Sequence, residues 1–99
     1  MLGAASNREI LMRMLHNLKN IYIKKEQWSK ALVASDRIIA IMPDDCDEYR
    51  DRAMIYIELE CFRAARADFQ TYLEKAPDAE DAGVVWQYVI NLQPAARLN

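Results

Sequence analysis

Residues 15–43, LHNLKNIYIKKEQWSKALVASDRIIAIMP, decide the fold, because their pattern of large, small and helix-ending residues occurs twice in the chain. The first copy is marked by Leu15, Leu18, Tyr22, Trp28, Ala31 and Pro43. The second copy follows after 34 residues and is marked by Tyr49, Tyr56, Phe62, Ala65 and Pro77. Self-similarity at such a period predicts paired helices that stack on copies of themselves.

The period and the order of these residues resemble the tetratricopeptide repeat, a helix–turn–helix unit. Aligned over 12–45 and 46–79, the two copies share seven identical residues, and these fall on the positions that define the pattern. The resemblance implies an all-α, right-handed solenoid of antiparallel helix pairs, with about two and a half repeats and five helices. The expected domain is 7–92, divided into repeat one (12–45), repeat two (46–79) and a C-terminal half repeat (80–92), between tails at 1–6 and 93–99.

Two capping boxes predict where helices begin. Ser6 with Glu9, and Asp45 with Glu48, have the spacing at which the first side chain accepts from a free N–H group and the second reaches back to the cap. We therefore expect one helix from about residue 7 and another from about residue 46.

Prolines predict where helices end, because proline cannot continue a helix. Pro43 and Pro77 close the two repeats, and Pro94 should stop a fifth helix that spans about 79–92 and is capped by Asp78.

Four residues of the pattern are expected in the core. Ala31 and Ala65 should lie where the two helices of each pair cross closely, so a larger side chain there would force them apart. Trp28 and Phe62 should fill the space between consecutive helices, since large aromatic groups bury well.

Composition excludes several classes of function. The chain has 99 residues, a net charge of −2 and no basic stripe, which argues against nucleic-acid binding. Its two cysteines form no paired motif and it has no charged, apolar leader or membrane-spanning run, so a cytoplasmic protein, or a fragment of one, is expected.

A narrower resemblance rests on three segments, 17–22 (NLKNIY), 43–53 (PDDCDEYRDRA) and 60–65 (ECFRAA). They are similar to the C-terminal repeats of bacterial transglutaminase-like tetratricopeptide proteins, in which a papain-like domain precedes the repeats. The resemblance covers about residues 6–92 and implies that the enzyme-like domain would lie before Met1, so it transfers no catalytic residue to this chain.

Metal binding and catalysis find little support in the sequence. His16, Cys46 and Cys61 lack the four ligands in short paired spacings of a zinc site, and neither cysteine has an activating base nearby in the sequence. The acidic run Asp44–Glu48 lacks the glycine and the distal glutamate of a calcium loop, and helix capping explains it better. We predict no cofactor, no enzymatic activity, His16 at the surface, and Cys61 as an apolar filler in a turn.

In the tetratricopeptide family the first helix of each pair lines a concave groove. The positions that this resemblance places there are Arg13, His16, Asn20, Ile23, Asp47, Arg50, Met54 and Ile57. Such a groove would accept an extended or helical segment of another protein. A clamp for the C-terminal carboxylate of chaperones is disfavoured, since His16 stands at a lysine position and Asp51 would repel the carboxylate. A plain solvated helix face is the alternative reading of the groove.

The last helix carries apolar groups around most of its circumference. We expect Val84, Val85, Trp86, Tyr88 and Val89 to form an interface with a second copy or with another domain. Two functions therefore remain open: a protein-interaction module, and a structural C-terminal domain that packs on an upstream transglutaminase-like domain or on itself.

Overall fold

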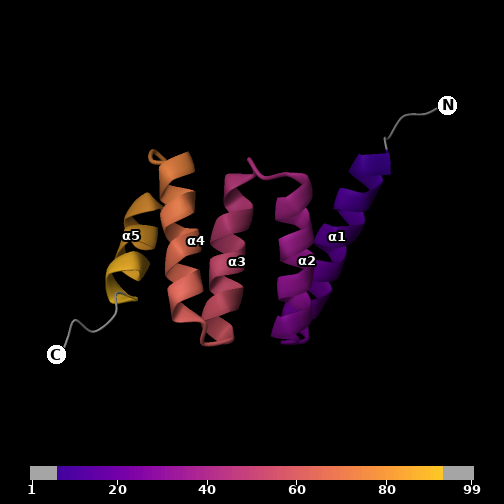
Figure 1. The fold of residues 1–99 in the computed structure, drawn as a ribbon, viewed down its shortest axis with the longest axis horizontal. Helices are drawn as coiled ribbons and strands as arrows, with labels where there is room; N and C mark the ends of the chain where they lie inside the picture. The colour runs from indigo at the N-terminus through magenta and orange to yellow at the C-terminus, as the bar shows by residue number, and fades with distance from the viewer. Residues whose placement is uncertain (1–6, 93–99) are drawn as a thin grey trace.

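The computed structural model describes residues 7–92 and consists of five α-helices in a single row (Figure 1). Each helix packs against its neighbour in the sequence. The described residues contain no β-strand. The helices are α1 (Asn7–Lys24), α2 (Trp28–Ile41), α3 (Cys46–Glu58), α4 (Phe62–Lys75) and α5 (Ala82–Asn91). This is the all-α arrangement of two helix pairs and a half pair that the sequence predicts.

Within each helix pair, the two helices are joined by a turn, and the two turns have the same geometry. Glu26 and Glu60 each follow the first helix of a pair with φ of 56° and 61°. In the first turn the N–H of Gln27 donates to the carbonyl of Tyr22 at 2.8 Å, and in the second the N–H of Cys61 donates to the carbonyl of Tyr56 at 2.8 Å. These are Schellman caps in which glutamate occupies the left-handed position that favours glycine. Of the residues that form these turns, Tyr22 and Glu26 are identical in the second copy, whereas Gln27 is replaced by Cys61.

The predicted helix ends are confirmed in the repeats and corrected elsewhere. Helices α2 and α4 end two residues before Pro43 and Pro77. Helix α5 begins at Ala82 with Asp81 in the cap position, so the prediction of a helix from 79 with Asp78 as its cap is wrong. Residues 76–81 form turns instead, in which the N–H of Ala79 donates to the carbonyl of Ala76 at 3.2 Å. Ser6 and Pro94 lie outside the described residues.

The capping box predicted at Asp45 and Glu48 does not form. Asp45 precedes α3, but its side chain makes no capping hydrogen bond. Glu48 points away from the cap and is buried between helices, where it binds Lys19 and Ser35. A buried cationic partner therefore outcompetes the free N–H groups for this carboxylate.

Small residues allow the helices to approach and large ones fill the space around them. Ala31 and Ala65 are fully buried, as expected at the crossing of each pair. Phe69 stacks on Tyr88 with ring centroids 5.0 Å apart, which fixes α5 against α4. The buried residues of this apolar core are Ala53, Ala65, Phe69, Tyr72, Leu73, Val85 and Val89.

The two aromatic residues that open the second helices differ in their surroundings. Trp28 is half-buried and shares a surface hollow with Leu59, the residue that follows α3. Phe62 is 46% exposed, so the prediction that it fills the space between helices is wrong. The position equivalent to Leu59 is 93, which follows α5 and lies outside the described residues.

Within the part of the chain that the structure describes, no helix is both long enough and apolar enough to cross a membrane.

Candidate protein-interaction groove

A cleft of about 310 Å³ lies between α1 and α3 and brings three of the predicted groove residues together. Asn20 and Ile23 come from α1, Met54 comes from α3, and Trp28 at the start of α2 also lines the cleft. Asn20 and Met54 are exposed, and Ile23 and Trp28 are half-buried. The complete lining consists of Lys19, Asn20, Ile23, Trp28, Asp51, Met54, Ile55 and Glu58.

Two further predicted residues belong to a second, separate cleft of about 540 Å³. Arg13 and His16 line it from α1, opposite Met42 and Asp45 from the loop between α2 and α3. Its remaining wall comes from the first turns of α1. The predicted groove is therefore two clefts along α1.

The other three predicted groove residues have partners of their own. Asp47 is exposed and pairs with Arg50, whose guanidinium also lies 3.1 Å from an oxygen of Asp81. Ile57 packs against the apolar core between α3 and α4. Arg50 therefore ties α3 to the start of α5, and a ligand would have to share its guanidinium with Asp81.

Beneath the first cleft lies a buried polar network that joins α1, α2 and α3. The Nζ atom of Lys19 donates to both oxygens of Glu48, at 2.9 and 2.7 Å, and to Asp51 at 3.0 Å. The hydroxyl of Ser35 donates to Glu48 at 2.9 Å. Lys19 is 3% exposed and Glu48 is 2% exposed, so the two buried charges compensate each other, and Lys19 has Asp51 as a second partner.

Burial alone would lower the pKa of Lys19, but the hydrogen bond and the charge of Glu48, together with those of Asp51, raise it above its usual 10.5. The ammonium is therefore charged at neutral pH.

A second network joins α2, α3 and α4 through Arg52. Its Nε and Nη2 atoms donate to the two oxygens of Asp68, at 2.7 and 2.8 Å, and its Nη1 donates to Asp36 at 3.0 Å. The forked guanidinium suits this bidentate contact, and Asp68 is buried. The hydrogen bond from Arg52 to Asp68 is the main reason that the pKa of Arg52 is raised.

The third polar contact holds the start of α5. The hydroxyl of Tyr72 donates to Asp81 at 2.5 Å, and this bond, followed by the nearby Arg50, lowers the pKa of Asp81. The same bond raises the pKa of Tyr72. The side chain of Asp81 is thereby used for docking α5, which explains why it does not cap that helix.

These polar networks were not predicted from the sequence. The signal was present, because repeat two carries Ala53 and Phe69 where repeat one carries Lys19 and Ser35. A cation and a hydroxyl at two positions that are apolar and buried in the other copy predict a polar partner. That partner, Glu48, was hidden by its suitability as a capping residue.

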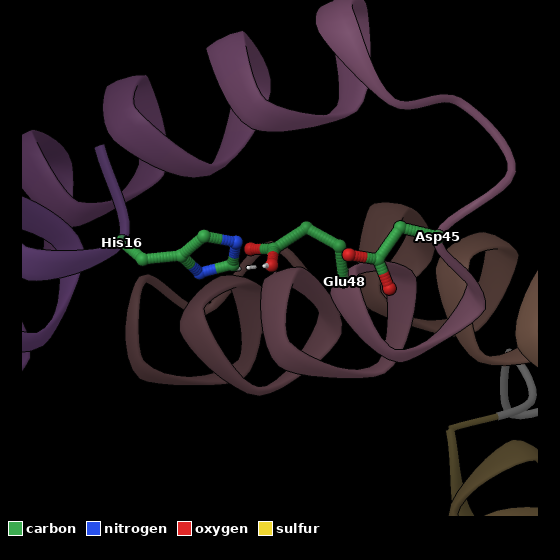
Figure 2. Close-up of side chains that lie close together, drawn as sticks. All are labelled: His16, Asp45 and Glu48. Carbon is green, nitrogen blue, oxygen red and sulfur yellow. Dashed lines mark ion pairs between the residues drawn. The ribbon is translucent and has the colours of Figure 1, made fainter. Parts of the chain in front are cut away.

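Three potential metal ligands meet near this network, which the spacing along the chain did not indicate. Single ligand atoms of His16, Asp45 and Glu48 all lie within 4.8 Å of one another, with His16 on one side of Glu48 and Asp45 on the other (Figure 2). The Nδ1 atom of His16 lies 4.0 Å from Glu48. Both oxygens of Glu48 already accept from the ammonium of Lys19, which would repel a divalent cation placed here. The position of Glu48 therefore suits its ion pair with Lys19 better than a metal site.

The cysteines are both unpaired. Cys46 is half-buried at the start of α3, and Cys61 is exposed, so the expectation that Cys61 fills a turn as an apolar group is wrong. The Sγ atom of Cys61 instead faces the carbonyl of Leu59 at 3.8 Å.

The chain is similar to several bacterial proteins. A UPF0162 protein of Xylella fastidiosa is 32% identical over 91 residues, which are 92% of this chain and 32% of that protein. Protein SirB1 of Salmonella typhimurium is 34% identical over 77 residues, 78% of this chain and 29% of that protein. A UPF0162 protein of Vibrio cholerae is 35% identical over 77 residues, 78% of this chain and 28% of its own length. The chain thus spans about a third of the length of these relatives. No solved structure matches it significantly.

The family model described as "Tetratricopeptide repeat" matches residues 18–89. This span runs from the second half of α1 to the second half of α5 and includes the paired helices with their repeated turns. The chain therefore belongs to the tetratricopeptide repeat family.

Proposed function

We propose that this chain is a non-catalytic protein-interaction module whose cleft between α1 and α3 binds a peptide or helical segment of another protein. The observation that carries the proposal is that accessible apolar residues form one wall of the cleft, while a buried hydrogen-bonded network below them holds the three helices in place. Ile23, Trp28 and Met54 form the wall, and the network around Lys19 lies beneath it. Membership of the tetratricopeptide repeat family supports a role in protein interaction.

The lining suggests which segment would fit. An apolar side chain of the ligand would contact Ile23 and Met54, and the amide of Asn20 offers both donors and an acceptor to a peptide backbone. Glu58 is exposed at the rim and makes no ion pair with another described residue. We therefore expect a ligand with an apolar anchor and a basic residue beside it.

Trp28 provides a direct readout of binding. The chain contains two tryptophans, so Trp86→Phe leaves Trp28 as the only indole, and its fluorescence reports on the cleft. Peptides selected from a displayed library against this variant should shift the emission of Trp28 on titration. Met54→Ala should weaken binding about tenfold, since a buried contact in a pocket is worth more than about 1 kcal/mol.

The matched control is Val33→Ala, which removes an exposed apolar residue from α2 outside this cleft. If the selected peptides bind Met54→Ala and the parent equally, or leave the emission of Trp28 unchanged, the cleft is not the binding site. Arg50 is unsuitable for this test, because its replacement would also release Asp81.

A second candidate function is a structural domain that packs on an upstream transglutaminase-like domain or on a second copy. Exposed apolar residues on the last helix favour it, since Val84, Trp86 and Ile90 are each more than half exposed. Val85 and Val89 of the predicted interface instead lie in the core, and Tyr88 stacks on Phe69. Light scattering should show a dimer that Trp86→Ser dissociates; a monomer at all concentrations would remove self-association through α5.

The free thiols of Cys46 and Cys61 support the proposed cytoplasmic location, because unpaired cysteines suit a reducing compartment.

A further inference from the structure

The two copies of the repeat differ at one face of their first helix, which we call the outer face and which in the second copy points toward the preceding helix. In the second copy, that helix covers this face. On α3, Glu48, Arg52 and Ile55 share one face because they are spaced by four and three residues. Ser35 and Asp36 of α2 bind Glu48 and Arg52, and Glu48 and Ile55 are almost completely buried. The helix α2 therefore lies across this face of α3.

The equivalent face of α1 is apolar and uncovered. The residues 34 positions earlier are Met14, Leu18 and Ile21, which are 56%, 39% and 46% exposed. Ile10 and Leu11 extend the same exposed surface toward the start of α1. No described helix occupies the position over α1 that α2 occupies over α3.

Next to this exposed face, a hollow lies between α1 and α2, and we call it the slot. In repeat two, Arg52 and Asp68 fill the corresponding space with their ion pair, but repeat one has Leu18 and Ala34 at these positions. The result is a hollow of about 340 Å³. Its lining consists of Leu15, Leu18, Tyr22, Lys30, Val33, Ala34 and Arg37.

Two cations stand at the rim of the slot. Lys30 and Arg37 are exposed, lie seven residues apart on α2, and pair with no carboxylate of residues 7–92. Lys30 instead lies 5.9 Å from the centre of the Tyr22 ring. Arg50 and Arg52, by contrast, have acidic partners, so the charges of Lys30 and Arg37 make the slot locally basic.

We propose that the outer face of α1 and the adjoining slot bind an amphipathic α-helix that carries acidic residues beside its apolar face. The bound helix takes the position over α1 that α2 takes over α3. A large apolar side chain enters the slot next to Leu18, and carboxylates of the ligand pair with Lys30 and Arg37. This site lies apart from the cleft between α1 and α3 and does not depend on it.

The charges distinguish this ligand from a second copy of the chain docking through its last helix. Helix α5 exposes Val84, Trp86 and Ile90, but Ala82–Asn91 contains no aspartate or glutamate. It could fill the slot, but the acidic residues nearest to it, Glu80 and Asp81, precede its first turn, and Asp81 is already held by Tyr72 and Arg50. No carboxylate therefore lies beside its apolar face. An acidic amphipathic helix satisfies both the apolar and the basic parts of the surface.

The test uses two synthetic helical peptides with leucines along one face. One carries glutamates beside the leucines, and the other carries lysines at the same positions. Calorimetric titration of the chain should show binding of the glutamate peptide and at least about tenfold weaker binding of the lysine peptide. Lys30→Glu with Arg37→Glu should reverse this preference.

Two variants locate the binding, and both replace exposed residues so that folding is preserved. Leu18→Glu and Met14→Glu should each abolish binding of the glutamate peptide, whereas Met54→Ala in the other cleft should leave it unchanged. The proposal is overturned if neither peptide binds, if both bind equally, or if Met54→Ala removes binding. It is also overturned if the chain self-associates and Leu18→Glu makes it monomeric.

Discussion

Removal of the Lys19 side chain tests whether the buried ion pair holds the first three helices together. Lys19→Ala leaves Glu48 buried with Ser35 as its nearest remaining donor among the described contacts. Breaking a buried pair by removal of one partner costs about 3–5 kcal/mol. A small domain has a free energy of unfolding of about 5–15 kcal/mol, so this single change should remove a large part of it.

Removal of the other partner, Glu48, is expected to cost less, because Lys19 has a second carboxylate partner and Glu48 has no second lysine or arginine beside it among the described residues. Glu48→Ala leaves the ammonium of Lys19 bound to Asp51 at 3.0 Å, and Asp51 is partly exposed to water. We expect a loss of about 2 kcal/mol for Glu48→Ala, the range found for hydrogen bonds to charged groups. The double variant leaves neither charge uncompensated and should cost less than the sum of the two single variants.

Urea unfolding followed by circular dichroism measures these free energies. Lys24→Ala is the matched control, since Lys24 is exposed at the end of α1 and should change stability by less than about 0.5 kcal/mol. A cost below about 1 kcal/mol for Lys19→Ala, or a larger cost for Glu48→Ala than for Lys19→Ala, would refute the reasoning.

Four further predictions concern the same helices. Ala65→Leu should cost about 1–3 kcal/mol by overpacking the crossing of α3 and α4, and an unchanged thermal unfolding curve would contradict this. Glu60→Gly should raise stability by about 0.5–1 kcal/mol, because glycine adopts the φ of 61° without strain; a lower urea midpoint would show that the glutamate side chain matters more. Arg52→Lys should destabilise by about 1–3 kcal/mol, since lysine cannot make the forked contact to Asp68, and equal stability of the two proteins would argue against that contact. Stability should also fall at high pH: because the pKa of Lys19 is raised above 10.5, its contribution is complete below 10.5 and is lost as the pH rises through the raised value. Urea midpoints measured across this range should fall less steeply for Lys19→Ala than for the parent, and equal slopes would exclude Lys19 as the cause.

Local patterns made the number and pairing of the helices predictable. The recurrence of Tyr22, Ala31 and Pro43 after 34 residues specified two helix pairs, because proline stops a helix and alanine permits close crossing. The helix that starts at about residue 46 was also predictable, although the reason given for it, a capping box, was wrong.

The candidate sites depended on information that spacing does not carry. The eight positions assigned to the groove were placed correctly on α1 and α3, yet only Asn20, Ile23 and Met54 line one cleft together. Arg50 pairs with Asp81, which also accepts a hydrogen bond from Tyr72. No rule based on sequence spacing links these three residues.

The sequence by itself determined the helical repeat, its period and its turns, since these follow from interactions between residues near one another in the chain. Only the tertiary structure decided how the polar residues are used. Lys19, Ser35 and Glu48 come from three different helices, and a charge becomes structural only when packing removes it from water and supplies its partner. The same packing decides that Ile55 is buried by its neighbours while Ile21, its counterpart in the first repeat, remains exposed.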